Sequence, residues 1–98
     1  MGLSSFDRDV LNQIIDNVVK DIRPIVEFAN MPELRSMYNY KDGSDFSLGA
    51  AVTELNMSFD AGFKMRNGRP VNEDEKAEMF NILGKRIHEI KEAISELN

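Results

Sequence analysis

The apolar residues near the C-terminus recur at a spacing that helix packing explains. They stand 3, 4, 3, 4 and 3 residues apart, at Phe80, Leu83, Ile87, Ile90, Ile94 and Leu97. In an α-helix this alternation places all six side chains on one narrow stripe, which is typical of a helix that packs against other helices. Residues 72–98 are therefore predicted to form a long packed helix, and the rest of the chain must provide surfaces for it to pack on.

The start of that helix is marked by two residues that can cap each other. Asn72 is followed three residues later by Glu75, with Glu73 and Asp74 between them. In such a capping box each side chain accepts a hydrogen bond from the backbone amide of the other residue, and acids favour the positive end of the helix dipole. Met79 and Ile82 widen the apolar face in the first half, so this half is predicted to pack within the chain.

A second long helix is predicted to begin at Ser4 or Ser5, because a hydroxyl side chain there can cap the first turn. Its apolar residues recur three and four positions apart, at Val10, Leu11, Ile14, Ile15, Val18, Val19 and Ile22. Pro24 then removes a backbone donor and presses on the preceding turn. We expect a kink near Arg23; the alternative is a clean end to the helix followed by a separate turn.

A third long helix is predicted over residues 45–67. Gly68 is its left-handed terminator, and Pro70 follows. Two apolar stripes run along it, the first at Leu48, Val52, Leu55, Phe59 and Phe63 and the second at Ala50, Met57, Ala61 and Met65. Two adjacent stripes predict a wide buried face, so this helix is expected to form the centre of the bundle.

A short helix is predicted between the first two long ones. Asn30 with Glu33 resembles a capping pair, Pro32 suits the first turn, and the helix would run to about Tyr40. The competing interpretation is a β-hairpin, in which Tyr38, Tyr40, Phe46 and Leu48 alternate on either side of a turn at Asp42 and Gly43. The predicted fold is all-α: a small up-down bundle of three long helices and one short helix, forming a single domain over residues 1–98.

The composition limits the classes of function. Seventeen acidic against twelve basic residues give a net charge of −5, which argues against nucleic acid as a partner. The chain has no cysteine, so disulfides and thiolate chemistry are excluded. No stretch has the roughly 20 apolar residues of a membrane span, and the first residues do not have the pattern of a secretory signal. The sequence therefore predicts a cytoplasmic protein that does not enter membranes.

No catalytic, cofactor-binding or metal-binding motif is recognised in the sequence. The single histidine, His88, is predicted to lie on the solvated face of its helix without a second ligand nearby. The sequence therefore predicts that the protein is not an enzyme and needs no cofactor. Glu54 and Asp60 keep a small enzyme open as a third hypothesis, because carboxylates in a helical cleft can act as acids or bases.

The leading functional prediction is a protein–protein interaction module that acts as an assembly, adaptor or inhibitor subunit. Its C-terminal helix narrows to a coiled-coil-like stripe, which predicts self-association, most simply as a dimer, through Ile87, Ile90, Ile94 and Leu97. A separate partner surface is predicted where methionines and aromatics are hard to bury together on one short helix, at Met31, Met37, Tyr38 and Tyr40.

The alternative prediction is a site for a small anion or a nucleotide. The second part of the chain, residues 61–98, is less acidic than the first, and its densest basic cluster is Lys64, Arg66 and Arg69 at the end of the third long helix. Lys85 and Arg86 would complete the site from a second subunit, because they lie roughly 20 Å away along one helix.

Overall fold

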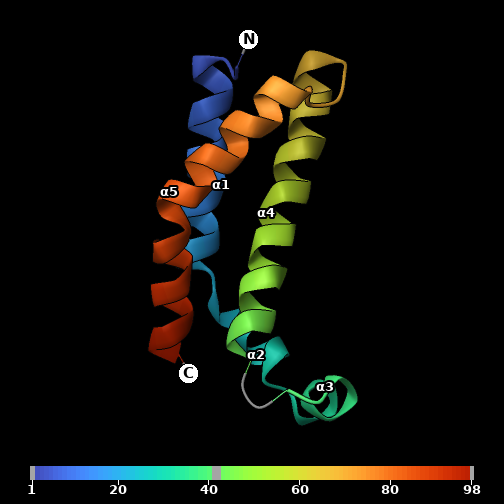
Figure 1. Cartoon of the computed structure of the whole chain (residues 1–98), viewed down its shortest axis with the longest axis vertical. Helices are drawn as coiled ribbons and strands as arrows, with labels where there is room; N and C mark the ends of the chain where they lie inside the picture. Colours follow the sequence, from blue (N-terminus) through green and yellow to red (C-terminus); the bar gives the residue numbers. More distant parts are fainter. Residues whose placement is uncertain (1, 41–42, 98) are drawn as a thin grey trace.

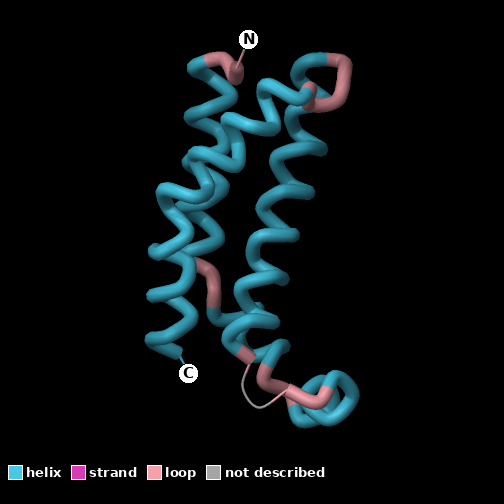
Figure 2. The backbone as a smooth tube through the Cα atoms, viewed as in Figure 1, coloured by secondary structure: helices cyan, strands magenta, loops and turns pink. Residues whose placement is uncertain are grey.

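The computed structural model describes residues 2–40 and 43–97, and those ranges contain five α-helices and no strand (Figures 1 and 2). The helices are α1 (Ser5–Lys20), α2 (Arg23–Ala29), α3 (Pro32–Tyr38), α4 (Ser44–Asn67) and α5 (Glu73–Leu97). The all-α prediction is confirmed, whereas the prediction of three long helices and one short one is wrong by one short helix.

The three long helices lie side by side, and the two short ones connect the first to the second (Figure 1). Helices α1 and α5 run in the same direction and α4 runs in the opposite one. The α2 helix packs on α4 and α5, while α3 contacts α2 and projects at the end of the molecule. None of the described helices combines the length and the apolarity that a membrane span requires.

Three of the predicted helix ends are confirmed. Ser4 caps α1, and its hydroxyl accepts a hydrogen bond from the backbone amide of Asp7 at 3.1 Å. The capping box before α5 is closed in both directions, with Glu75 N donating to Asn72 Oδ1 at 2.8 Å and Asn72 N donating to Glu75 Oε1 at 2.9 Å. Gly68 ends α4 in the left-handed conformation, with φ of 68°. Each of these signals involves residues only a few positions apart.

The predicted kink at Arg23 is not formed, and the alternative of a clean helix end is observed. Helix α1 ends at Lys20, the chain leaves helical geometry at Asp21, and α2 begins at Arg23. Pro24 thereby occupies the first turn of a new helix, where the amide that proline lacks would have had no partner. Breaking the helix gives α2 a direction of its own, so that it can pack on α4.

The residues on both sides of the predicted turn belong to helices, so the hairpin interpretation is wrong. Tyr38 is the last residue of α3, Asn39 takes the left-handed conformation with φ of 56°, and Phe46 and Leu48 both lie in α4. Asp42, the predicted turn residue, lies outside the described residues. Helix α3 also differs from prediction at both ends, since Met31 is its cap and it ends at Tyr38 rather than at Tyr40.

One hydrophobic core joins α1, α2, α4 and α5. Its buried members are Leu3, Leu11, Ile15, Val18, Ile22, Val26, Ala51, Leu55, Phe59, Phe63, Met79, Leu83, Ile90 and Ile94. Helix α3 contributes no buried residue to it.

The buried stripe of α5 differs from the predicted one at its start. Met79, Leu83, Ile90 and Ile94 are buried, whereas the side chain of Phe80 is 56% exposed. Met79 and Phe80 are adjacent and both apolar, so the spacing pattern suited either of them. The rotation of α5 is set by its packing on α1 and α4, and this packing turns Met79 inwards and Phe80 outwards.

The buried face of α4 is narrower than predicted. It consists of one residue per turn, namely Ser47, Ala51, Leu55, Phe59 and Phe63. Met57 and Met65, which were predicted to form a second buried stripe, are 66% and 87% exposed. All of the helices that pack on α4 lie on one side of it, so its opposite face remains open to solvent.

The corrected orientation of α5 leads to a matched pair of variants. Ile94→Ala should lower the free energy of unfolding by about 2–5 kcal/mol, because it opens a cavity in the core. Phe80→Ala should change it by about 0.5 kcal/mol or less, because the side chain is mostly in solvent. Urea unfolding followed by circular dichroism measures both values, and a larger loss for Phe80→Ala than for Ile94→Ala would contradict this orientation.

Candidate functional site

The arginines of the predicted anion site are bound to carboxylates of the chain itself. Arg66 donates to Asp7 Oδ1 from Nη2 at 2.8 Å and from Nε at 3.1 Å. The Asp7 side chain is buried, and Asn67 and Ser4 also donate to it. Burial alone would raise the pKa of Asp7, but the hydrogen bonds and charge of its partners outweigh it and hold the pKa below its ordinary value.

Arg69 is held in the same way at the start of α5. It forms two parallel bonds to the buried Glu75 carboxylate, at 2.8 and 2.9 Å. These bonds, above all, lower the pKa of Glu75 from 4.5 to about 2. The guanidinium groups of Arg66 and Arg69 also lie over the rings of Phe59 and Phe63, 6.0 and 5.2 Å from the ring centroids. Both arginines therefore pair with buried carboxylates and cover core phenylalanines at this end of the bundle.

Arg86 joins α5 to α1. It pairs with Asp16 and with Glu89, donating to Glu89 Oε1 at 2.7 Å, and it also donates to the backbone carbonyl of Asn12 at 3.1 Å. The hydrogen bonds to Glu89 are the main cause that raises the pKa of Arg86. Lys64 and Lys85 are exposed but lie outside this pair network. The structure thus uses all three arginines for internal contacts and gives the anion-site prediction no support.

The C-terminal stripe predicted to self-associate is largely covered within the chain. Ile90 and Ile94 are core residues with 0% and 2% of their surface exposed, and Ile87 and Leu97 are half-buried against the same core. This corrects the expectation that the stripe is free to meet a second copy. Its narrow spacing is explained by the packing of α5 on α1, α2 and α4 of its own chain. Self-association itself stays a prediction.

The predicted partner surface is exposed over three of its four residues. Met31, Met37 and Tyr38 are exposed, with Met37 at 70% and Tyr38 at 62%. Tyr40 is half-buried, and its hydroxyl donates a hydrogen bond to the backbone carbonyl of Ala29. Tyr40 therefore fixes the α2–α4 corner, while the other three residues form an apolar surface on and beside α3.

Phe46 was missing from the predicted surface and links its parts. Its ring centroid lies 5.4 Å from that of Tyr40, 5.9 Å from that of Tyr38 and 6.5 Å from that of Phe28. Phe28 is itself an exposed residue of α2. These four rings form an aromatic cluster where α2, α3 and α4 meet. Tyr38, Tyr40 and Phe46 are near one another in the sequence, whereas the contact with Phe28 depends on the packing of α2 on α4.

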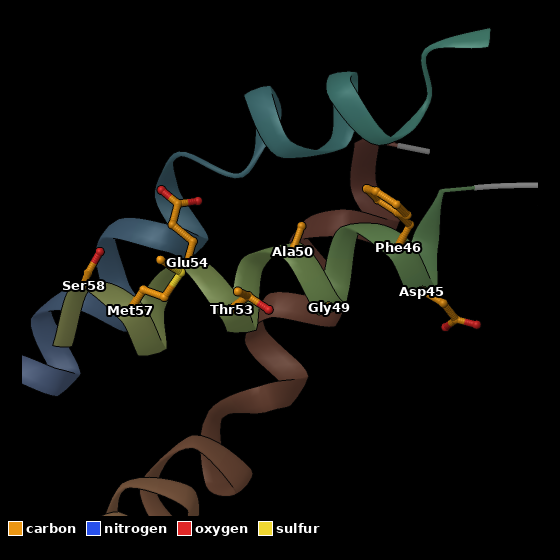
Figure 3. Close-up of a pocket in the computed structure, with 8 residues that line it drawn as sticks. All are labelled: Asp45, Phe46, Gly49, Ala50, Thr53, Glu54, Met57 and Ser58. Carbon is orange, nitrogen blue, oxygen red and sulfur yellow. The ribbon is translucent and has the colours of Figure 1, made fainter. Parts of the chain in front are cut away.

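A shallow groove begins at Phe46 and follows the open face of α4 (Figure 3). It has a volume of about 730 Å³ and a mainly apolar lining, and all of its lining residues belong to α4: Asp45, Phe46, Gly49, Ala50, Thr53, Glu54, Met57 and Ser58. A side chain at Gly49 would meet nothing within 4 Å. Glycine inside a helix costs about 0.5–1 kcal/mol relative to alanine, and no contact within the described chain requires it here.

Two residues of the groove, Ala50 and Met57, were predicted to belong to a second buried stripe of this helix. Gly49, Thr53 and Met57 are spaced four residues apart, so they lie on one face of the helix. The same spacing is compatible with a face exposed to solvent. Choosing between the two interpretations requires the tertiary structure. His88 is exposed, as predicted, and no group of three or more potential metal-ligating side chains converges anywhere in residues 2–40 and 43–97.

Comparison with known proteins found no family model, curated protein or solved structure that matches this chain.

The buried carboxylates of Asp7 and Glu75 make the stability of the fold depend on pH in the acid range. Their pKa values are lower in the folded than in the unfolded chain, so the stability that they contribute is present above about pH 4.5 and is lost as the pH falls towards 2. The thermal midpoint should fall over this range, and Glu75→Gln should make the fall shallower. Glu73→Gln is the control, because Glu73 is an exposed acid of the same turn. Identical acid profiles for the three proteins would contradict this role of Glu75.

Proposed function

We propose that this chain is a non-enzymatic helical module that binds another protein through the apolar surface where α2, α3 and α4 meet. The observation that carries the proposal is that α3 buries none of its residues while Met37 and Tyr38 extend into solvent. A seven-residue helix is too short to be stable by its own propensity. A partner that covers Met37 and Tyr38 would bury this helix and stabilise it.

The chemistry of the surface is that of protein interfaces. Methionine, tyrosine and phenylalanine are enriched at such interfaces relative to the rest of the protein surface, and the aromatic rings bury large areas with few rotatable bonds. Here the exposed side chains of Met37 and Phe28 lie at the same end of the bundle as the stacked rings of Phe46 and Tyr40. The rings form a rigid support, and the methionines are adaptable.

A role as an assembly, adaptor or inhibitor subunit fits such a surface, because each of these roles requires binding to another protein and no catalysis. We favour a different protein as the partner over a second copy, since the C-terminal stripe predicted to form a dimer is used in the core. We place the role in the cytoplasm, because a chain without cysteine suits a reducing compartment.

The test is affinity capture from a lysate of the native host, with the partner quantified by mass spectrometry. The double variant Met37→Ser, Tyr38→Ser should recover about a tenth or less of the partner recovered by the wild type, since truncating two central apolar residues costs several kcal/mol of binding. Its thermal midpoint should stay within a few degrees of the wild type, because neither side chain is buried.

The matched control is the double variant Gln13→Ser, Asn17→Ser on the exposed face of α1. It should recover the partner as the wild type does. Light scattering on the purified chain gives the oligomeric state in parallel. Equal recovery by the Met37, Tyr38 variant and the wild type would exclude this surface as the binding site.

A further inference from the structure

The shape of the α4 groove suits a helix. Phe46 and Met57 stand at its two ends, with Gly49 and Ala50 between them (Figure 3). Eleven residues of helix separate the two ends, which is roughly 16 Å or three turns. A helix that lies along this face can place one bulky apolar side chain over Gly49, where the space is open, and others against Phe46 and Met57.

The charged side chains that line the groove, Asp45 and Glu54, are both acidic. Asp60 is exposed less than one turn beyond Met57, where it lines a neighbouring hollow together with Lys64 and Lys76. No lysine or arginine occurs in residues 44–63. None of the three carboxylates takes part in an ion pair within the described chain. Lys91 of α5 lines a neighbouring hollow together with Asp45 but does not pair with it. These acids contrast with Asp7, Asp16, Glu75, Glu78 and Glu89, which are paired.

We infer that the α4 groove binds a basic amphipathic helix of the partner protein. The inference rests on the proposed interaction role and names the chemistry of the partner. The apolar side of such a helix fills the space over Gly49 and Ala50, and its lysines or arginines reach Asp45, Glu54 and Asp60. Phe46 belongs both to this groove and to the aromatic cluster, so the two surfaces are continuous.

A second copy of the chain is a poorer occupant of this groove. Two α4 faces laid together would bring Asp45, Glu54 and Asp60 of one copy near the same acids of the other. Like charges across an interface oppose association, and each copy also carries a net charge of −5. The mutual repulsion favours a basic partner over self-association at this face.

Three synthetic peptides test the inference on the full chain by fluorescence anisotropy. The first is an amphipathic helix of about 18 residues, or five turns, with leucines on one face and lysines beside them. The second has glutamate in place of each lysine, and the third has the composition of the first in an order that is not amphipathic. The first should bind about tenfold or more tightly than either of the others, and its affinity should fall as salt is raised.

Gly49→Leu locates the binding site. The added side chain has open space and favours the helix, so the variant should melt no lower than the wild type. It fills the groove, however, and should weaken binding of the basic peptide about tenfold or more. Gly84→Leu is the control, because Gly84 also faces open space but lies on α5 outside the groove. It should bind the peptide as the wild type does.

The contribution of charge is tested by Glu54→Gln. This variant should bind the basic peptide several-fold more weakly and with a smaller dependence on salt, whereas Asp9→Asn, at an exposed acid of α1, should change neither. The inference would be overturned if the acidic peptide, or the basic peptide whose order is not amphipathic, bound as tightly as the basic amphipathic peptide. Unchanged binding of the basic amphipathic peptide by Gly49→Leu would overturn it as well. The proposed function would stand or fall separately, because host capture by the Met37, Tyr38 variant measures it without reference to charge.

Discussion

The bundle is organised around one buried stripe of α4, on which α1, α2 and α5 pack. Its residues grow in size along the helix, from Ser47 and Ala51 near α2 to Leu55, Phe59 and Phe63 towards the other end. The small residues allow close approach where α2 packs, as the 3.1 Å separation between a Cβ placed on Gly43 and the Cβ of Ala29 illustrates. Because α1, α2 and α5 all pack on one stripe, the opposite face of α4 is exposed at Gly49, Thr53 and Met57. At the start of that face, Phe46 contacts the aromatic rings that come from α2 and from the segment at the end of α3.

The two ends of the bundle differ in chemistry. At one end Arg66 and Arg69 pair with the buried Asp7 and Glu75, so the charges of these carboxylates are neutralised. Buried pairs of this kind add little net stability, but removing one partner leaves an uncompensated charge and is costly. At the other end α3 and the ring of Phe46 remain accessible. The basic residues at the first end are thus used in internal pairs, and the accessible apolar surface lies at the other end.

Gly49 lies in the α4 groove and has no packing role within the described chain. Within the described chain a side chain there would touch nothing, so the cost of a flexible residue in a helix interior is not offset by packing. Gly84 of α5 is equally open and has no groove around it. What distinguishes Gly49 is its setting between Phe46 and Met57 among unpaired acids, and this setting is the basis for assigning the groove a ligand.

The sequence by itself determined the three long helices and several of their ends. The caps at Ser4 and Asn72 and the terminator at Gly68 act over a few residues, so they can be identified without knowing what lies across the molecule. The same holds for the exposed Met37 and Tyr38, which one short helix cannot bury. These predictions needed only local geometry and composition.

Only the tertiary structure decided which face of each helix is buried. Met79 and Phe80 are neighbours of similar hydrophobicity, and Met57 fits a buried stripe as well as an open groove, so spacing alone does not choose between them. Likewise Pro24 allows either a kinked helix or two helices, and the packing of α2 on α4 selects the second. The reason is physical: a helix carries the same side chains at every rotation about its axis, and only the surfaces packed against it fix that rotation.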